Sequence, residues 1–249
     1  MPEYTLQPSK GFTTGCDYLK DLNPEQLQAV TAEDGPCMVI AGAGSGKTRV
    51  VTCRVAYLIE HGVPAENILL ITFTQKAARE MLRRASGLTN IDISKLWGGT
   101  FHHVGNLILR EHASKIGFNS DYTILDGEDS KDLLHICKQE VTTEQTGKLF
   151  PKAGVLQDIL GLSINTQEHI RKVIKERYPH MEEFTRDIQK VFNRYEKKKK
   201  EINALDFDDL LEKVFILLKE NKEIKETYSL NFKHILVDEY QDTNLLQAE

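Results

Sequence analysis

The sequence is poor in cysteine and lacks a metal-binding cysteine motif. Its 249 residues include four cysteines, at positions 16, 37, 53 and 137, and none of them has the Cys-x-x-Cys spacing of a zinc site. Cys37 and Cys53 fall within apolar patterns. We therefore expect reduced and mostly buried thiols, as is usual in the cytoplasm, rather than disulfides or metal ligands.

A long apolar run is also missing. No hydrophobic stretch approaches the roughly 20 residues of a membrane-spanning helix, and the start Met1-Pro2-Glu3 does not resemble a signal peptide. We therefore expect a cytoplasmic protein without a membrane partner. Hydrophobic residues still make up 40% of the chain and charged residues 28%, which excludes a disordered or fibrous protein and supplies enough apolar surface for a core.

The sequence also lacks an excess of positive charge. The formal net charge is -5, so binding to nucleic acid would need a local basic surface. Two stretches could supply one: a predicted helix over residues 75–84 that carries four basic side chains, and the lysine run at residues 197–200. The ordinary explanation of either stretch is a solvated helix face.

A glycine-rich motif is the main feature that is present. An apolar run at residues 37–41 predicts a strand, and Val51, Val55 and Leu58, at helical spacing, predict a helix. Between them lies Gly-Ala-Gly-Ser-Gly-Lys-Thr. A strand, a glycine-rich turn and a helix in this order form the context of a phosphate-binding loop, because the loop N–H groups and the helix N-terminus both attract anions.

The loop predicts a site for ATP and Mg²⁺. Lys47 is expected to reach the β and γ phosphates, and the Thr48 hydroxyl to hold Mg²⁺. The strict motif opens with glycine where this chain has Ala41, so the alternative is a flexible glycine–serine loop that ends in Lys-Thr by chance. The predicted nucleotide-binding residues of the loop are Ala41, Gly42, Ala43, Gly44, Ser45, Gly46, Lys47 and Thr48.

Two adjacent acids near residue 240 are the predicted counterpart of this loop. Residues 234–237 predict a buried strand, and Asp238 and Glu239 follow it directly. Unpaired charge is costly to bury, so such a pair is uncommon as packing. Opposite a phosphate loop, Asp238 would hold the Mg²⁺ shell and Glu239 would orient and deprotonate the attacking water, which makes Glu239 and Lys47 the predicted catalytic residues.

Two further stretches lie between the phosphate loop and the acidic pair, which are the two predicted half-sites for the nucleotide. Residues 68–72 predict a strand of a parallel sheet, because short apolar runs that alternate with helices are typical of such sheets. Phe73 and Thr74 follow, ahead of the basic helix, and would suit single-stranded nucleic acid; the alternative is a core Phe beside a solvated helix. Residues 98–99, both glycine, predict a turn at which another group comes close to the backbone. The paired histidines at 102–103 lack a metal-ligand spacing, so a zinc site is not expected.

The middle of the chain changes character. From residue 111 to residue 204 strand signals thin out and helical spacing dominates, as in the stripe Phe184, Ile188, Val191 and Tyr195. Three acids at 206–209 begin a further helix, where the helix dipole explains them better than a metal site does. That helix is expected to end near Lys219, followed by a charged and exposed tract.

The distance in sequence between the two half-sites predicts an inserted domain. The expected fold class is α/β: a P-loop domain with a parallel sheet, interrupted by an all-helical insertion domain. The expected segments are a poorly ordered leader at 1–20, a nucleotide-binding domain at 21–110 and 205–249, and the helical insertion at 111–204.

Taken together, the motifs resemble those of a known family. The chain is similar to the N-terminal part of the UvrD/Rep/PcrA-like superfamily 1 DNA helicases, and the similar segments occur in the family's order from about residue 21 onward. These segments are 22–30, 41–49, 71–81, 99–102, 206–211 and 235–244.

The resemblance implies a RecA-like domain (1A) split by a helical domain (1B), and ATP-driven 3′ to 5′ movement on single-stranded DNA and at single-strand/double-strand junctions, in DNA repair or replication. It also implies site residues: Gln26 at the adenine with Arg49 nearby, Phe73 and Thr74 on single-stranded DNA, and Thr100 and His102 near its backbone. Gln75 stands where the family commonly has Asn and His103 where it commonly has Ser, so the resemblance implies no DNA contact at those two positions.

The sequence stops soon after the second half-site. We expect a piece of a longer enzyme whose remaining chain supplies a second RecA-like domain and an arginine finger. Alone, the piece should bind ATP and DNA weakly, hydrolyse ATP poorly and not unwind duplex, because such arginines contribute on the order of 10³-fold or more. The alternatives are the motor part of a helicase–nuclease and a short non-enzymatic module that binds ATP or DNA.

Overall fold

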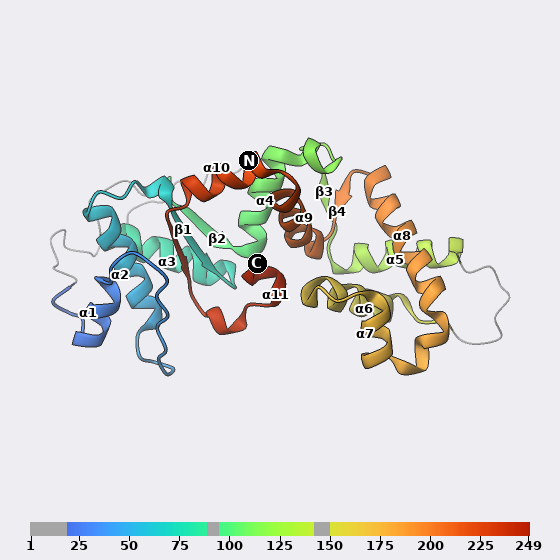
Figure 1. The fold of residues 1–249 in the computed structure, drawn as a ribbon, viewed down its shortest axis with the longest axis horizontal. Coiled ribbons are helices and arrows are strands. Elements are labelled where there is room, and N and C mark those ends of the chain that lie inside the picture. Colours follow the sequence, from blue (N-terminus) through green and yellow to red (C-terminus); the bar gives the residue numbers. More distant parts are fainter. Residues whose placement is uncertain (1–18, 89–94, 142–149) are drawn as a thin grey trace. The chain divides into compact units, whose positions relative to one another are not determined.

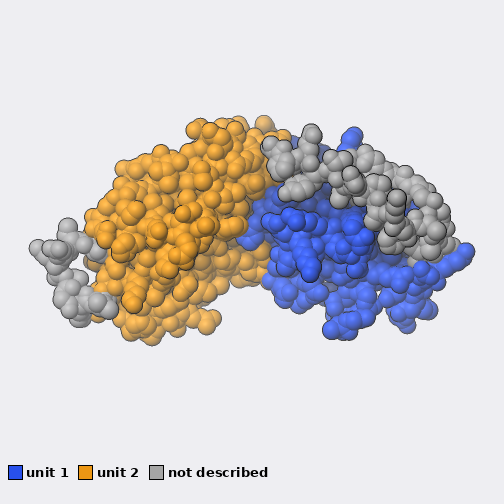
Figure 2. All heavy atoms as spheres, turned by 180° about the vertical axis from the view of Figure 1, so that it is seen from behind, with its two compact units in different colours: residues 1–104, 225–242 blue, residues 105–224, 243–249 orange. Residues whose placement is uncertain are grey.

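The computed structural model describes residues 19–88, 95–141 and 150–249 (Figure 1). Its contacts divide the chain into two compact units, coloured separately in Figure 2. Unit 1 contains the chain up to residue 104 together with residues 225–242, and unit 2 contains residues 105–224 and 243–249. The predicted leader at 1–20 lies almost wholly outside the described residues.

Unit 1 is built on a three-stranded parallel sheet. β1 (Ile68–Thr72) lies in the centre, between β2 (Trp97–Thr100) and β5 (His234–Val237) (Figure 1). Every residue of β1 is buried, as its continuous apolar run predicts for a central parallel strand. Because all strands run the same way, their carboxyl ends share one edge of the sheet.

Unit 1 also contains several helices. They are α1 (Pro24–Val30), α2 (Lys47–Glu60), α3 (Gln75–Leu88), the first turn of α4 (Phe101–His112) and most of α10 (Lys222–Asn231), with short 3-10 turns η1 (Ala65–Asn67) and η4 (Tyr240–Asp242). The main core lies between α2, α3 and β1. Its members include Val55, Leu58, Ile59, Ile68, Leu70, Met81 and Ala85.

α1 begins with a capping box, a motif formed by its N-cap residue and the third residue of the helix. Asn23 accepts a hydrogen bond from the Gln26 backbone N–H at 2.8 Å, and the Gln26 side chain accepts one from the Asn23 N–H at 3.1 Å. Pro24 occupies the first helical position, where its missing N–H costs nothing. A cap of this kind contributes about 1 kcal/mol and fixes where the helix begins.

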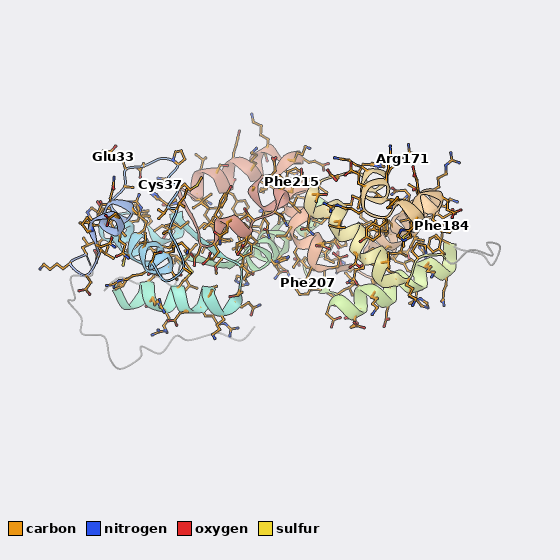
Figure 3. The ribbon with its side chains drawn as sticks, turned by 90° about the horizontal axis from the view of Figure 1, so that it is seen from below. Glu33, Cys37, Arg171, Phe184, Phe207 and Phe215 are labelled. Atoms are coloured by element: carbon orange, nitrogen blue, oxygen red, sulfur yellow. The ribbon has the colours of Figure 1, made fainter. Side chains whose placement is uncertain are left out.

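The predicted strand at residues 37–41 is wrong. This segment has no strand pairing, and its side chains face outward: Met38 is 76% exposed and Ile40 is 88% exposed. A strand exists only where a neighbouring chain satisfies its backbone groups, and no described strand pairs with this segment. The expectation that Cys37 is buried is wrong as well, because Cys37 is exposed (Figure 3).

The predicted glycine turn at residues 98–99 is a strand instead. Both glycines belong to β2, and each is needed because another residue comes close. A Cβ at Gly98 would lie 2.6 Å from the Leu82 side chain, and one at Gly99 would lie 2.6 Å from the His103 ring. The glycines therefore permit close packing of α3 and α4 on the sheet.

Unit 2 is almost entirely helical. Its helices are the rest of α4, α5 (Gly127–Val141), α6 (Ala153–Thr166), α7 (Ile170–Arg177), α8 (Thr185–Glu201), α9 (Phe207–Glu220) and the one-turn α11 (Leu245–Ala248), with 3-10 turns η2 (Ala113–Ile116) and η3 (Pro179–Phe184). Two short strands, β3 (Thr123–Ile124) and β4 (Ala204–Leu205), pair in parallel.

The core of unit 2 contains the stripe expected from the sequence. Ile188, Val191 and Tyr195 of α8 are buried, and Phe184 packs against them from just before the helix (Figure 3). α5, α6 and α7 supply the rest of the core. Those residues include Leu134, Cys137, Leu156, Ile159 and Ile174.

One lysine of the run at 197–200 is not on a solvated face or an open phosphate-binding patch. Lys199 is 1% exposed and donates hydrogen bonds to Asp206 at 3.0 Å and Asp209 at 2.6 Å. The helical period explains this position, because Lys199 follows Tyr195 by one turn on the buried face of α8. The prediction for the lysines at 197–200 treated them as one group and did not apply the helical repeat, which places Lys199 on the buried face.

The tract after Lys219 also differs from expectation. It is not only charged and exposed, because α10 begins at Lys222 and buries Ile224 and Tyr228. α9 groups with unit 2 by contacts, whereas the sequence assigned it to the nucleotide-binding domain; the division into domains 1A and 1B stays a prediction. Within the described ranges, no helix is long and apolar enough to cross a membrane.

Candidate functional site

The glycine-rich loop leads directly into α2. Gly46 is the N-cap residue of α2 and has a φ of 87°, and Gly44 has a φ of 77°; L side chains rarely adopt such values. The two left-handed glycines turn the loop so that α2 begins at Lys47. Among the described residues no side chain caps this helix, so its first N–H groups remain available to a phosphate.

Lys47 bends back over the loop. Its ammonium group donates to the carbonyl oxygens of Ala41 and Gly42, each at 3.2 Å. The Ser45 hydroxyl donates to the Gly42 carbonyl at 2.7 Å and closes the turn. Lys47 thus contacts the first two residues of the predicted loop, and its ammonium is the group that would face the β and γ phosphates.

Gln26 touches the loop from α1. Its side-chain amide donates to the Ser45 carbonyl at 2.9 Å, and a Cβ on Gly46 would come within 2.9 Å of the same amide nitrogen. Arg49, in the first turn of α2, forms a surface ion pair with Asp21 at 3.3 Å. The structure thus places both predicted adenine-side residues beside the loop.

The two half-sites meet at Thr48 and Asp238. The Thr48 hydroxyl donates to a carboxylate oxygen of Asp238 at 3.2 Å, across 190 sequence positions. Asp238 is only 5% exposed, and its backbone N–H donates to the Ile71 carbonyl at 2.9 Å, which extends the pairing of β5 with β1. A hydroxyl and a carboxylate side by side are the protein oxygens that Mg²⁺ commonly takes next to a nucleotide.

Those two residues fit a magnesium ion better than a protein-only metal cage. Among the residues that the structure describes, no group of three or more His, Cys, Asp or Glu side chains could hold a metal. Mg²⁺ usually keeps several waters and binds through one or two carboxylates together with substrate phosphates. The predicted ligand set of Thr48 and Asp238 therefore suits an ion that arrives with ATP.

Glu239 has an unusual backbone. Its φ is 54°, in the left-handed region that non-glycine residues seldom occupy. Such a conformation costs on the order of 1–3 kcal/mol and persists only where the surroundings enforce it. The Asp242 N–H donates to the Glu239 carbonyl at 2.9 Å, and the Gln241 side chain donates to the Glu239 carboxylate. Strain of this kind is concentrated at functional sites.

Two aromatic rings lie at the same edge of the sheet. Phe73 follows β1, and Phe101 follows β2; their ring centroids are 5.5 Å apart. Sequence reasoning selected Phe73 and missed Phe101. The signal was available, because Phe101 follows its strand as Phe73 does, and the residues before them, Thr72 and Thr100, are paired in the sheet.

The predicted threonine contacts have structural tasks here. The Thr74 hydroxyl accepts from the Ala77 N–H at 3.1 Å and caps α3. Thr100 is buried, and its hydroxyl accepts from the His103 N–H at 3.2 Å at the start of α4. His102 is half-buried on the first turn of α4. These residues border the same sheet edge as Phe73.

Comparison with known proteins gives close relatives. UvrD1 of Mycobacterium tuberculosis, an ATP-dependent DNA helicase, is 38% identical over 237 residues, covering 93% of this chain and 30% of the relative. PcrA of Staphylococcus epidermidis, also an ATP-dependent DNA helicase, is 37% identical over 231 residues, covering 92% of this chain and 31% of the relative. This chain therefore spans less than a third of the length of these relatives.

The family match covers nearly the whole chain and includes every site residue described above. The model of the UvrD/REP helicase N-terminal domain matches residues 22–249. The match agrees with the phosphate loop, the acidic pair and the parallel sheet that the structure places together. The chain therefore belongs to the UvrD/REP helicase family, through the family's N-terminal domain.

Proposed function

We propose that this chain is the ATP-binding motor segment of an ATP-dependent DNA helicase, with a RecA-like domain 1A and a helical domain 1B. The observation that carries the proposal is the hydrogen bond between Thr48 and Asp238, which joins the phosphate loop to the acidic pair. The movement on single-stranded DNA, 3′ to 5′, belongs to the same proposal, as do DNA junctions and a second RecA-like domain as partners.

The proposed binding step uses charge and shape. The loop N–H groups and the α2 N-terminus receive the phosphates of ATP, and Lys47 neutralises the β and γ oxygens. Thr48 and Asp238 would hold Mg²⁺, and the ion would supply positive charge beside the phosphates during phosphoryl transfer. Gln26 and Arg49 flank the adenine. Their placement beside Gly46 and Asp21 supports that assignment.

The proposed hydrolytic step uses Glu239 as general base. Its carboxylate takes a proton from the water that attacks the γ phosphorus, and the bond from that phosphorus to the leaving β–γ bridging oxygen breaks. The strained backbone at Glu239 supports a role in which the orientation of its carboxylate matters. An arginine from the second RecA-like domain would complete the charge stabilisation, so hydrolysis by this chain alone should be slow.

DNA is proposed to lie along the carboxyl edge of the sheet. Phe73 and Phe101 offer ring faces for base stacking, and α3, which begins at the same edge, carries basic side chains. Arg83 and Arg84 are each paired with Glu80 on α3, at 2.8 Å and 2.7 Å, so their positive charge is partly balanced. Stacking is therefore expected to contribute more than charge.

ATP hydrolysis with and without single-stranded DNA tests the proposal. We expect Lys47→Ala to weaken nucleotide binding, and Glu239→Gln to leave binding intact while it abolishes turnover. Glu66→Gln is the matched control, because Glu66 is exposed and lies in η1, just before the amino end of β1. Turnover by Glu239→Gln at the wild-type rate would remove the general base from the proposal.

The length of the active unit needs its own comparison. The same assays are made with this chain and with any longer natural polypeptide that contains it. Turnover only in a longer polypeptide supports the need for a second domain. Brisk turnover by the 249 residues alone would show a self-contained ATPase instead. Binding of ATP or DNA with no turnover in any form would favour the non-enzymatic module.

A further inference from the structure

A pocket lined by aromatic rings lies at the amino edge of the sheet of unit 1, and its volume is about 150 Å³. Asn67 stands directly before β1, Trp97 begins β2, and Phe232 comes two residues before β5. These are the amino ends of the strands, whereas Phe73 and Asp238 follow the carboxyl ends. We refer to the lining residues as the aromatic pocket; they are Glu66, Asn67, Trp97, Tyr228, Asn231 and Phe232.

Three aromatic side chains form the apolar part of this pocket. Trp97 packs edge-to-face with Tyr228 and Phe232, with ring centroids 6.2 Å and 5.2 Å apart. Tyr228 and Phe232 stack at 5.7 Å, one helical turn apart on α10 (Figure 1). The ordinary task of such a cluster is to anchor a helix on a sheet. Here Tyr228 is buried, but Trp97 and Phe232 are only half-buried and keep ring surface within reach of a ligand.

The other three lining residues carry side-chain oxygens that can accept hydrogen bonds. The Asn67 side-chain nitrogen donates to the Asn231 carbonyl at 2.6 Å, so the oxygen of the same amide is the atom that can accept from a ligand. Glu66 is exposed and supplies a carboxylate. None of the described residues that line the pocket is cationic. Ring faces beside negative charge suit a cation.

The size of the pocket restricts what can enter it. Sites for drug-sized ligands have volumes of about 300–1,000 Å³, so this pocket suits a single side chain better than a nucleotide. A nucleic acid would also bring its phosphates toward the Glu66 carboxylate. An arginine matches both parts of the pocket, because its planar guanidinium stacks on aromatic rings and its N–H groups suit a carboxylate and an amide oxygen. Guanidinium is also more weakly hydrated than the ammonium of lysine.

We propose that the aromatic pocket is a docking site for an arginine side chain of a partner protein, with the guanidinium stacked against Trp97 and Phe232 and paired with Glu66. This inference goes beyond the proposed function and does not depend on it. The pocket and the Thr48–Asp238 contact lie at opposite edges of one sheet. A partner held in the pocket therefore leaves the nucleotide site open.

The fluorescence of Trp97 provides the test, because Trp97 is the one tryptophan of the sequence. The probe is a glycine pentapeptide with one central arginine and both ends blocked, titrated at constant ionic strength. We expect a saturable change with a dissociation constant of about 1–10 mM, as is reasonable for a single side chain. The same peptide with lysine should bind about threefold more weakly. The peptide with citrulline, which has the shape of arginine without its charge, should bind about tenfold more weakly.

Protein variants show where the peptide binds. Glu66→Gln should weaken binding of the arginine peptide about two- to fivefold, because an exposed ion pair contributes little. Glu33→Gln is the matched control and should leave binding unchanged: Glu33 is exposed and does not line the pocket, and its replacement alters the net charge equally (Figure 3). Phe232→Leu keeps apolar bulk but removes a ring face, so saturable binding should be lost.

Several results would overturn the proposal. They are equal affinity for the arginine and citrulline peptides, an equal effect of the two glutamate variants, or unchanged binding in Phe232→Leu. A lysine peptide that binds as tightly as the arginine peptide would refute the choice of arginine. A change in Trp97 fluorescence with protein concentration alone would place a second copy of this chain in the pocket instead.

The test does not depend on every variant folding. If Phe232→Leu does not fold, the citrulline peptide and the comparison of Glu66→Gln with Glu33→Gln decide the outcome. These titrations contain neither ATP nor DNA, so failure of the docking site and failure of the proposed ATPase are observed separately.

Discussion

At the scale of single residues, the site depends on backbone conformations that few amino acids adopt. Gly44 and Gly46 turn the phosphate loop, and Glu239 holds a left-handed φ without being glycine. The two glycine positions were predictable, because glycine in a tight loop commonly indicates a positive φ. The third position was not predictable, since nothing in the residue type glutamate indicates a positive φ.

Gly46→Ala should damage the loop through two separate effects. The φ of 87° strains any L side chain by about 1–3 kcal/mol, and the new Cβ would meet the Gln26 amide at 2.9 Å. Urea unfolding and ATP-analogue binding measure the loss, and adding Gln26→Ala should relieve only the steric part. Gly127→Ala is the control, because Gly127 has open space around it. Equal stability of the two alanine variants would contradict this account.

Phe73→Ala and Phe101→Ala should each weaken binding of single-stranded oligonucleotide. A stacked base contributes about 1–3 kcal/mol, so we expect about a tenfold loss of affinity for either change. Fluorescence anisotropy at fixed salt measures it. Phe232→Ala serves as control, because Phe232 packs on Trp97, at the amino end of β2. A loss confined to Phe73→Ala would show that Phe101 belongs only to the core.

At the scale of elements, local sequence patterns predict individual helices and strands, but they do not predict which segments pair with one another. β1 was predictable as a buried parallel strand from its continuous apolar run, and α1 was predictable because its cap is encoded within four residues. β5 is a strand as predicted, but the expectation that it is buried is wrong, because it lies at the border of the described sheet and Ile235 is 60% exposed. The segment 37–41 has the same apolar character but no described partner strand. The contact of Asn165 with Asn244 spans 79 positions, and no local pattern indicates it.

Replacing Lys199 should lower the free energy of unfolding, because its side chain is buried on α8. Lys199→Met leaves the carboxylates of Asp206 and Asp209 without their shared cation, which typically destabilises a fold by about 3–5 kcal/mol. Lys197→Met is the control on the same helix, where the side chain is 72% exposed and the change should be within about 0.5 kcal/mol. Urea unfolding compares them. Similar losses in both variants would refute the distinction.

At the scale of the whole molecule, this buried cluster links stability to pH. Burial, and next the Asp206 carboxylate, raise the pKa of Asp209 to about 7, although Lys199 and Lys213 oppose the rise. For Asp206, burial alone would raise the pKa, but Lys199 and hydrogen bonds to the carboxylate lower it. Burial alone would also raise the pKa of Glu196, but Lys199 and Lys213 lower it.

The sign of the Asp209 contribution follows from its raised pKa. The group favours the folded state below its ordinary value of 3.8, and this advantage is lost as the pH rises toward about 7. The free energy of unfolding of Asp209→Asn, relative to wild type, should therefore increase between pH 4 and pH 7 and then level off. Urea titrations across this range measure it, with the exposed Asp187→Asn as control. A constant difference would show that Asp209 is already ionised.

The outward-facing segment at residues 37–41 has a practical consequence for handling the protein. Met38 and Ile40 expose apolar surface, and Ile235, on β5 at the border of the described sheet, is 60% exposed. Apolar side chains beside an open strand edge promote association between molecules. Ammonium sulfate strengthens apolar contacts, so light scattering in a salt series should show this chain precipitating early, and Ile40→Lys should delay the onset.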